Sequence, residues 1–279
     1  MAEYVTKVRT NQGDKQIDYN ALANLPTISN PNLLINSDFR NPVNQRGKTS
    51  YTGTGSTIRY TIDRWGVVNG PVITIQDDSL KIQVSSADTY TGRFKQVFEK
   101  PLPVDFYTLS VKVKSSTHNV EIGNFGKINA GFTGIYSHTS IERSLSDIEF
   151  VIAKGGVLEI EWIKLERGTT ATPFSPRLYA EEMAICQRYY KILHRTPMFA
   201  ADAARVSYFV PAVFGIPLRD APVLTNIQVV ELLNSSAVNQ TDTSVTAISA
   251  YKQNIASITL SKNIGTFGYI SLNLDTEIY

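Results

Sequence analysis

Hydrophobic and polar residues alternate along several short stretches of the chain. Residues 80–84, Leu-Lys-Ile-Gln-Val, show the pattern, and it recurs at 109–114, 158–162 and 270–278. A period of two places apolar side chains on one face of a strand and polar side chains on the other. Turn-rich segments such as 51–56 separate these stretches. Many short strands with this punctuation predict antiparallel β-sandwiches or jelly rolls.

The stretch at about 178–194 has a different pattern. Glu181 and Glu182 lie near its start and Arg188 and Lys191 near its end, which suits a helix dipole. Apolar residues cover more than half of the helical circumference, so we expect this helix to be covered on several sides.

These patterns predict an all-β fold class, with two antiparallel β-sandwich or jelly-roll modules joined by one α-helix and preceded by an extended N-terminal arm. The arm is polar and lacks sustained periodicity. The predicted boundaries are 1–30 for the arm, 31–176 for the first module, 177–199 for the linking helix and 200–279 for the C-terminal module.

Composition narrows the classes of function. The chain has 279 residues, 42% of them hydrophobic, which is enough for two cores. The net charge of +2 gives no reason to expect nucleic acid or a membrane surface as partner. No apolar run approaches the roughly 18–20 residues of a membrane span, and the N-terminus lacks a signal-peptide pattern. We therefore expect synthesis in a cytoplasm, without membrane insertion.

Catalytic signatures are missing from the sequence. The three histidines, His118, His138 and His194, have no metal-ligand spacing with one another or with a cysteine. The single cysteine, Cys186, lies in the apolar helical stretch, where a thiol is usually an inert hydrophobe. Nucleotide-binding and nucleophile-elbow motifs are not found. We predict that the protein is not an enzyme.

Three sets of residues resemble tail-fibre and receptor-binding proteins of tailed bacteriophages and prophages. The first is similar to a virion-attachment segment, and the other two are similar to the start and the end of a carbohydrate-binding-module-like jelly roll with the helix that follows it. These sets are 6–10 with 14–26; 32–40 with 45–47 and 62–65; and 162–168 with 171–174 and 186–190.

The resemblance implies a virion appendage, made in the host cytoplasm and carried on the phage particle. It implies a homotrimer that attaches to other virion proteins through residues 1–30 and binds a host cell-surface polysaccharide or protein during adsorption. Two alternatives stay open: a phage-borne glycan depolymerase, and a purely structural connector or capsid decoration such as a head fibre.

Candidate site residues follow from both lines of reasoning. Tyr208, Tyr251 and Tyr269 are the predicted ligand-binding residues, because tyrosine offers a flat apolar face and a hydroxyl. Jelly rolls of the resembled class often carry a structural Ca²⁺, and Asp38 and Glu161 are the carboxylates at the matching places. No other cofactor is expected. We also expect Phe39 and Trp162 in or near the core of the first module.

Overall fold

The computed structural model describes most of the chain, with an unbroken backbone from 29 to 200. The described residues are 7–10, 13–16, 29–200, 207–209, 223–233, 236–240, 245–250, 255–260, 267–275 and 277, with side chains for 29–192, 273, 275 and 277. Near the N-terminus, β1 (Lys7–Thr10) and β2 (Gly13–Gln16) form an antiparallel pair. In the part of the chain that the structure describes, no helix combines the length and the hydropathy that a membrane span requires.

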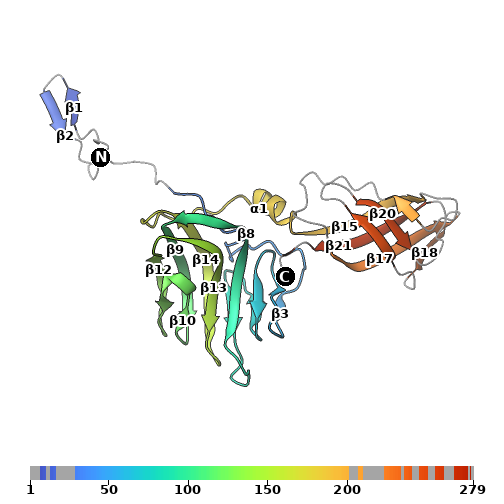
Figure 1. The fold of residues 1–279 in the computed structure, drawn as a ribbon, viewed down its shortest axis with the longest axis horizontal. Helices are drawn as coiled ribbons and strands as arrows, with labels where there is room; N and C mark the ends of the chain where they lie inside the picture. The colour runs from blue at the N-terminus through green and yellow to red at the C-terminus, as the bar shows by residue number, and fades with distance from the viewer. Residues whose placement is uncertain are drawn as a thin grey trace.

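The first module is a sandwich of two six-stranded antiparallel sheets (Figure 1). The first sheet runs in the order β12 (Gly134–Thr139), β9 (Tyr107–Ser116), β14 (Val157–Arg167), β7 (Leu80–Gln83), β6 (Val72–Ile75), β3 (Ser50–Thr52). The second sheet runs β11 (Lys127–Ile128), β10 (Val120–Glu121), β13 (Arg143–Ile152), β8 (Gly92–Asp105), β5 (Gly66–Val68), β4 (Arg59–Tyr60), with a 3₁₀ turn at Gly123–Phe125. The predicted all-β antiparallel fold is confirmed.

The core lies between the two sheets and follows the predicted alternation. Leu109 and Val111 of β9 are fully buried, as the period of two requires. Trp65 stacks on Phe94 with ring centroids 4.6 Å apart, and Phe39 meets Trp65 edge-on at 5.5 Å. Each such side chain contributes about 1.5–3 kcal/mol by leaving water. The prediction that Phe39 is a core residue is confirmed.

Trp162 is buried, with 8% of its surface exposed, but it lies on the outer face of the first sheet, so it is near the core, as predicted, and not within the main core cluster. The register of β14 against β9 shifts between Ile160 and Trp162. Such a bulge reverses which side chains face inward. The core contains Ile160, then Ile163 and Leu165, but not Trp162.

The linking helix is shorter than the sequence suggested. α1 spans Tyr179–Cys186, and Tyr190–Ala200 forms strand β15. Aromatic and β-branched residues from Tyr190 onward favour a strand, and Pro197 is excluded from a helix interior. Cys186 is the buried residue of α1, so the helix is covered on one side instead of several.

The described C-terminal strands all belong to one seven-stranded antiparallel sheet. These described strands do not form a second sheet that would complete a sandwich. Figure 1 shows this sheet beside the sandwich, with α1 near the junction. The order is β18 (Ser236–Gln240), β17 (Val223–Leu233), β21 (Phe267–Asp275), β15, β16 (Ser207–Phe209), β20 (Ile255–Leu260), β19 (Val245–Ala250). Polar contacts join its near end to the sandwich: Nη2 of Arg46 lies 3.2 Å from Asp275 Oδ2.

Candidate functional site: a groove on the outer face of the first sheet

Three rows of side chains cross β12, β9 and β14 on the outer face of the first sheet. Because directly paired residues point to the same side, the strand register defines each row. The rows are Ile135, Lys112 and Trp162; Ser137, Ser110 and Lys164; and Thr139, Thr108 and Glu166. The first row is apolar at both ends, and the other two are polar.

The segment 169–176, here called the strap, returns over this face after β14 ends. The hydroxyl of Thr108 donates to the carbonyl of Gly168 at 2.8 Å, where the chain reverses. Glu166 accepts a bond of 2.8 Å from the backbone N–H of Thr172, and Lys164 Nζ donates to the carbonyl of Pro173 at 3.0 Å. Lys164 and Glu166 are buried, and Lys164 Nζ lies 3.3 Å from Glu166 Oε2. The ion pair therefore holds the strap in place.

The strap carries Phe174 onto Trp162. Their rings are nearly parallel, with centroids 4.6 Å apart. The guanidinium of Arg40 lies 5.6 Å from the Phe174 centroid. Asp38 fixes that guanidinium through two hydrogen bonds of 2.7 and 2.9 Å, and this hydrogen bonding raises the pKa of Arg40. Arg40 is thus a preorganised cation beside an aromatic pair.

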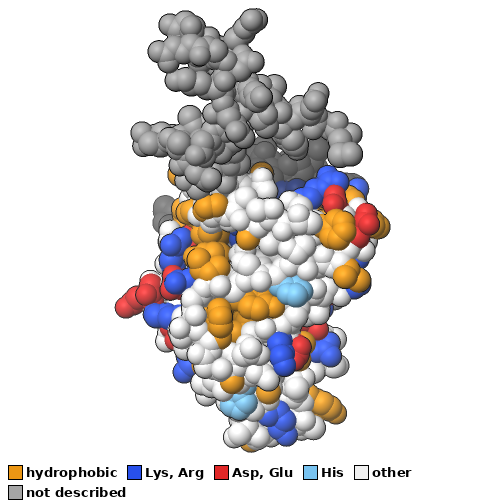
Figure 2. All heavy atoms as spheres, turned by 90° about the vertical axis from the view of Figure 1, so that its left-hand side faces the viewer, with side chains coloured by type: hydrophobic (Ala, Val, Ile, Leu, Met, Phe, Trp, Pro, Cys, Tyr) orange, Lys and Arg blue, Asp and Glu red, His pale blue; other side chains and the backbone are white. Residues whose placement is uncertain are grey.

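A groove of about 630 Å³ opens between the strap and β12. We call it the outer-face groove; it is lined by Arg40, Ser110, Ile135, Ser137, Trp162, Ala171–Phe174 and Pro176. Ile135 is 59% exposed, and the hydroxyls of Ser110 and Ser137 lie 2.9 Å apart. Figure 2, which faces the β12 side, shows hydrophobic side chains in small groups on a largely uncharged surface.

The lining combines three kinds of chemistry. Apolar surface comes from Ile135, Phe174 and the strap prolines, hydroxyl donors and acceptors come from the serines, and one fixed cation comes from Arg40. Among the described residues, no carboxylate lines this groove. Such a groove can pack the C–H face of a sugar and exchange hydrogen bonds with its hydroxyls.

The two carboxylates predicted to hold calcium lie close to this groove. Asp38 pairs with Trp162 in an isolated bridge, and the carbonyl of Glu161 accepts the N–H of Phe39 at 2.8 Å. Both carboxylates act on Arg40, whose pKa they raise. The described residues contain no group of three or more His, Cys, Asp or Glu that could hold a metal ion. In this structure Asp38 anchors Arg40, and calcium binding by Asp38 and Glu161 stays a prediction.

The three predicted ligand-binding tyrosines lie in the C-terminal module. Tyr208 is on β16, paired with Ala200, and Tyr269 is on β21, paired with Pro197. Strand β15 thus lies between them. Their side chains, and the whole of Tyr251, lie outside the described part of the structure. Ligand binding by these residues stays a prediction.

Sequence reasoning missed the lining residues of the groove. Arg40 and Phe174 lie within the stretches that resemble phage jelly rolls, but nothing in their spacing marks them as neighbours. The usable signal is around Lys164 and Glu166. Their alternation with Ile163 and Leu165 indicates that the inward phase of β14 changes after Ile160.

Comparison with known proteins gives few matches. No family model and no curated protein matches the chain. Among solved structures, it is similar to CBM29-2, a family 29 carbohydrate-binding module, in a variant complexed with mannohexaose, at 9% identity and a TM-score of 0.29. That match covers 43% of this chain and 91% of the module. A second variant of CBM29-2 matches over the same shares at 10% identity and a TM-score of 0.29. The function is therefore inferred from the groove itself.

Proposed function

We propose that this chain is a non-catalytic glycan-binding protein and that the outer-face groove is its binding site. The observation that carries the proposal is the stack of Trp162, Phe174 and Arg40 outside the hydrophobic core. Aromatic and aliphatic side chains on the wet face of a sheet cost solubility, and they are typical of surfaces that bind a ligand.

The shape and charge of the groove favour part of a polysaccharide over a small metabolite. It lies on a sheet face between the strap and β12, and its lining residue Ile135 is 59% exposed, so a segment of a polysaccharide can reach it from solvent. The serine hydroxyls suit the hydroxyls of a sugar. Since Arg40 is the charged group in the lining, neutral or acidic glycans fit better than basic ones.

The biological setting that we propose is phage adsorption. The chain would be a virion appendage, a tail fibre or receptor-binding protein, that attaches to the particle through residues 1–30 and binds host surface glycan or protein. Three segments support this setting through their resemblance to phage fibres. A homotrimer would multiply weak sugar contacts, because tethered sites raise the effective concentration for each later contact. Tyr208, Tyr251 and Tyr269 would add contacts from the C-terminal module.

Binding to an array of bacterial capsular polysaccharides and lipopolysaccharides tests the glycan proposal. We expect at least one polysaccharide to bind, and Ile135→Ser and Phe174→Ala to weaken that binding about tenfold or more. Ile141→Ser is the matched control, because Ile141 is an exposed isoleucine (72%) that does not line the groove. An array without binders, or equal binding by Ile135→Ser and the parent protein, would refute the proposal.

Light scattering from the purified protein tests the assembly. The chain has a mass of 30.9 kDa, so a trimer gives three times that value. A monomer mass at micromolar concentration contradicts the trimer and leaves the glycan proposal standing.

A further inference from the structure

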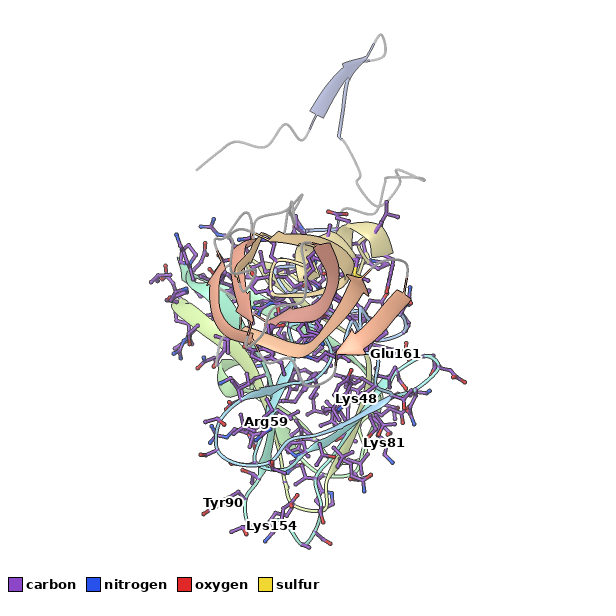
Figure 3. The ribbon with its side chains drawn as sticks, turned by 90° about the vertical axis from the view of Figure 1, so that its right-hand side faces the viewer. Lys48, Arg59, Lys81, Tyr90, Lys154 and Glu161 are labelled. Carbon is purple, nitrogen blue, oxygen red and sulfur yellow. The ribbon has the colours of Figure 1, made fainter. Side chains whose placement is uncertain are left out.

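A second groove lies where three loops meet at one end of the sandwich. It is formed by 53–56 between β3 and β4, by 69–70 between β5 and β6, and by 88–90 between β7 and β8, and its volume is about 470 Å³. In Figure 3, Tyr90 lies near the end of the sandwich remote from Glu161, which neighbours the outer-face groove. The two grooves are therefore separate places on the module. We call this one the loop groove.

Hydrogen bonds between the loops hold the loop groove open. The N–H of Asn69 donates to the carbonyl of Gly55 at 3.0 Å, and the N–H of Gly53 donates to the carbonyl of Pro71 at 3.1 Å. Asp88 Oδ2 accepts the N–H of Ser85 at 3.0 Å, which fixes the third loop. A binding site whose loops are already ordered loses less entropy when a ligand binds.

Gly70 lets the Asp88 carboxylate come close. Gly70 has a φ of +97°, and a Cβ there would lie 2.9 Å from Asp88 Oδ2. Any larger residue would suffer backbone strain and would push the carboxylate away. Asn69, with a φ of +61°, is also left-handed, so two successive residues take the conformation that places Asp88 beside this loop.

The side chains of the loop groove match the chemistry of a sugar. Tyr90 is 65% exposed and offers a flat ring with a phenol hydroxyl. Asp88 has a carboxylate oxygen to spare, and Asn69 offers an amide that donates and accepts. Among the described residues, no basic side chain lines this groove, in contrast to the outer-face groove with its Arg40.

We propose that the loop groove is a second saccharide site, which binds a neutral hexopyranose. The ring of Tyr90 packs against the C–H face of the sugar, and Asp88 accepts hydrogen bonds from its hydroxyls. An acidic sugar would be repelled by Asp88, because nothing basic in the lining offsets that charge. This site is independent of the outer-face groove, so either proposal can fail without the other.

Titration of the full chain with methyl hexopyranosides of mannose, glucose and galactose tests the loop groove. Saturation-transfer NMR and calorimetry at millimolar sugar should detect binding of at least one hexoside. We expect Tyr90→Ala and Asp88→Ala to weaken it about tenfold or more. Gly70→Ala should weaken it as well, since it displaces Asp88 without removing any group that binds the sugar.

Two controls separate this site from the first. Ile135→Ser should leave hexoside binding unchanged, and so should Tyr179→Ala, which removes another exposed tyrosine (45%) outside both grooves. Near-ultraviolet circular dichroism checks that each variant is folded. The proposal is overturned if no hexoside binds, or if binding survives Tyr90→Ala and is lost in Ile135→Ser.

Discussion

The carboxylate of Glu277 lies 2.6 Å from Nη1 of Arg64, and both side chains are almost completely buried. A second carboxylate oxygen of Glu277 accepts the backbone N–H of Arg64 at 3.0 Å. Arg64 is in the turn before β5, with a left-handed φ of 69°, and its guanidinium lies 3.8 Å from the ring centroid of Tyr189. Residues 213 positions apart in the sequence thus form one buried ion pair that joins the end of β21 to the sandwich.

Breaking this ion pair should destabilise the protein strongly. Glu277→Ala leaves the buried charge of Arg64 uncompensated, for which we expect a cost of about 3–5 kcal/mol in the free energy of unfolding. Urea unfolding measures it. The control is Asp78→Ala, which removes an exposed partner of Lys114 and should cost less than about 1 kcal/mol. Equal stability of the two variants would contradict the role given to Glu277.

Replacing both partners gives a sharper test of the same pair. The double variant Arg64→Leu with Glu277→Leu buries no unpaired charge, so it should be more stable than Glu277→Ala alone. If the loss of stability in the double variant equals the sum of the losses in Arg64→Leu and Glu277→Leu, the two residues do not act as a pair.

Acidity should stabilise the protein between about pH 7.5 and pH 5. Burial raises the pKa of Asp63 from 3.8 to about 6, although Gln45 donates to both of its oxygens, at 2.7 and 2.9 Å. The folded state therefore binds this proton more tightly than the unfolded state. Its contribution, roughly 3 kcal/mol at 1.36 kcal/mol per pKa unit, is fully present below about pH 4 and is lost as pH rises through 6.

Thermal unfolding at a series of pH values measures this dependence. Asp63 is the group tested, because its side chain is buried and its pKa is raised to about 6. Asp63→Asn should flatten the rise in Tm towards pH 5, whereas exposed Asp77→Asn should leave it unchanged. A parent protein whose Tm falls from pH 7.5 to pH 5 would show that Asp63 does not dominate the pH dependence.

The sequence predicted the architecture of the sandwich because alternation and turns are local signals. Phe39 was predicted in the core, and the alternation in β9 was predicted to turn Leu109 and Val111 inward; both predictions are confirmed. The predicted alternation placed Trp162 on the same face of β14 as Ile160, and this was wrong. A bulge between the two residues reverses the faces, and it is set by pairing with β9, whose residues are far away in the sequence. The alternation from Ile163 to Glu166 signals that reversal, but it does not show that Arg40 and Phe174 lie beside β14, so it could not have located the outer-face groove.

The linking helix shows the same limit. Residues 178–194 have helical charge order, but the pairing of Tyr190 with Asp275 on β21 draws the second half into a strand. Local propensity is a weak prior that tertiary pairing overrides. The buried ion pair between Arg64 and Glu277 could not be predicted at all, because charged residues 213 positions apart leave no local pattern in the sequence.

Cys186 should be inert in the folded protein. Its side chain is fully buried, and burial raises the pKa of the thiol, as does the negative charge of Asp63 nearby. Because the thiolate is the reactive form, a disulfide reagent at pH 8 should give no thiol signal without denaturant and one thiol per chain in urea. Fast labelling of the native protein would show that the packing around α1 opens readily.

Lys164 should control both the strap and the outer-face groove. Lys164→Met keeps the aliphatic stem, but it leaves the buried Glu166 without its cation, at a cost of about 3–5 kcal/mol. The strap then loses its anchor, so chymotrypsin should cleave after Phe174 faster than in the parent protein, and polysaccharide binding should fall with the loss of the Trp162–Phe174 stack.

Exposed Lys154→Met is the control. If Lys164→Met unfolds the chain, Thr172→Val removes one hydroxyl and tests the same anchor more gently. Unchanged cleavage and unchanged binding in both variants would mean that the ion pair does not position Phe174.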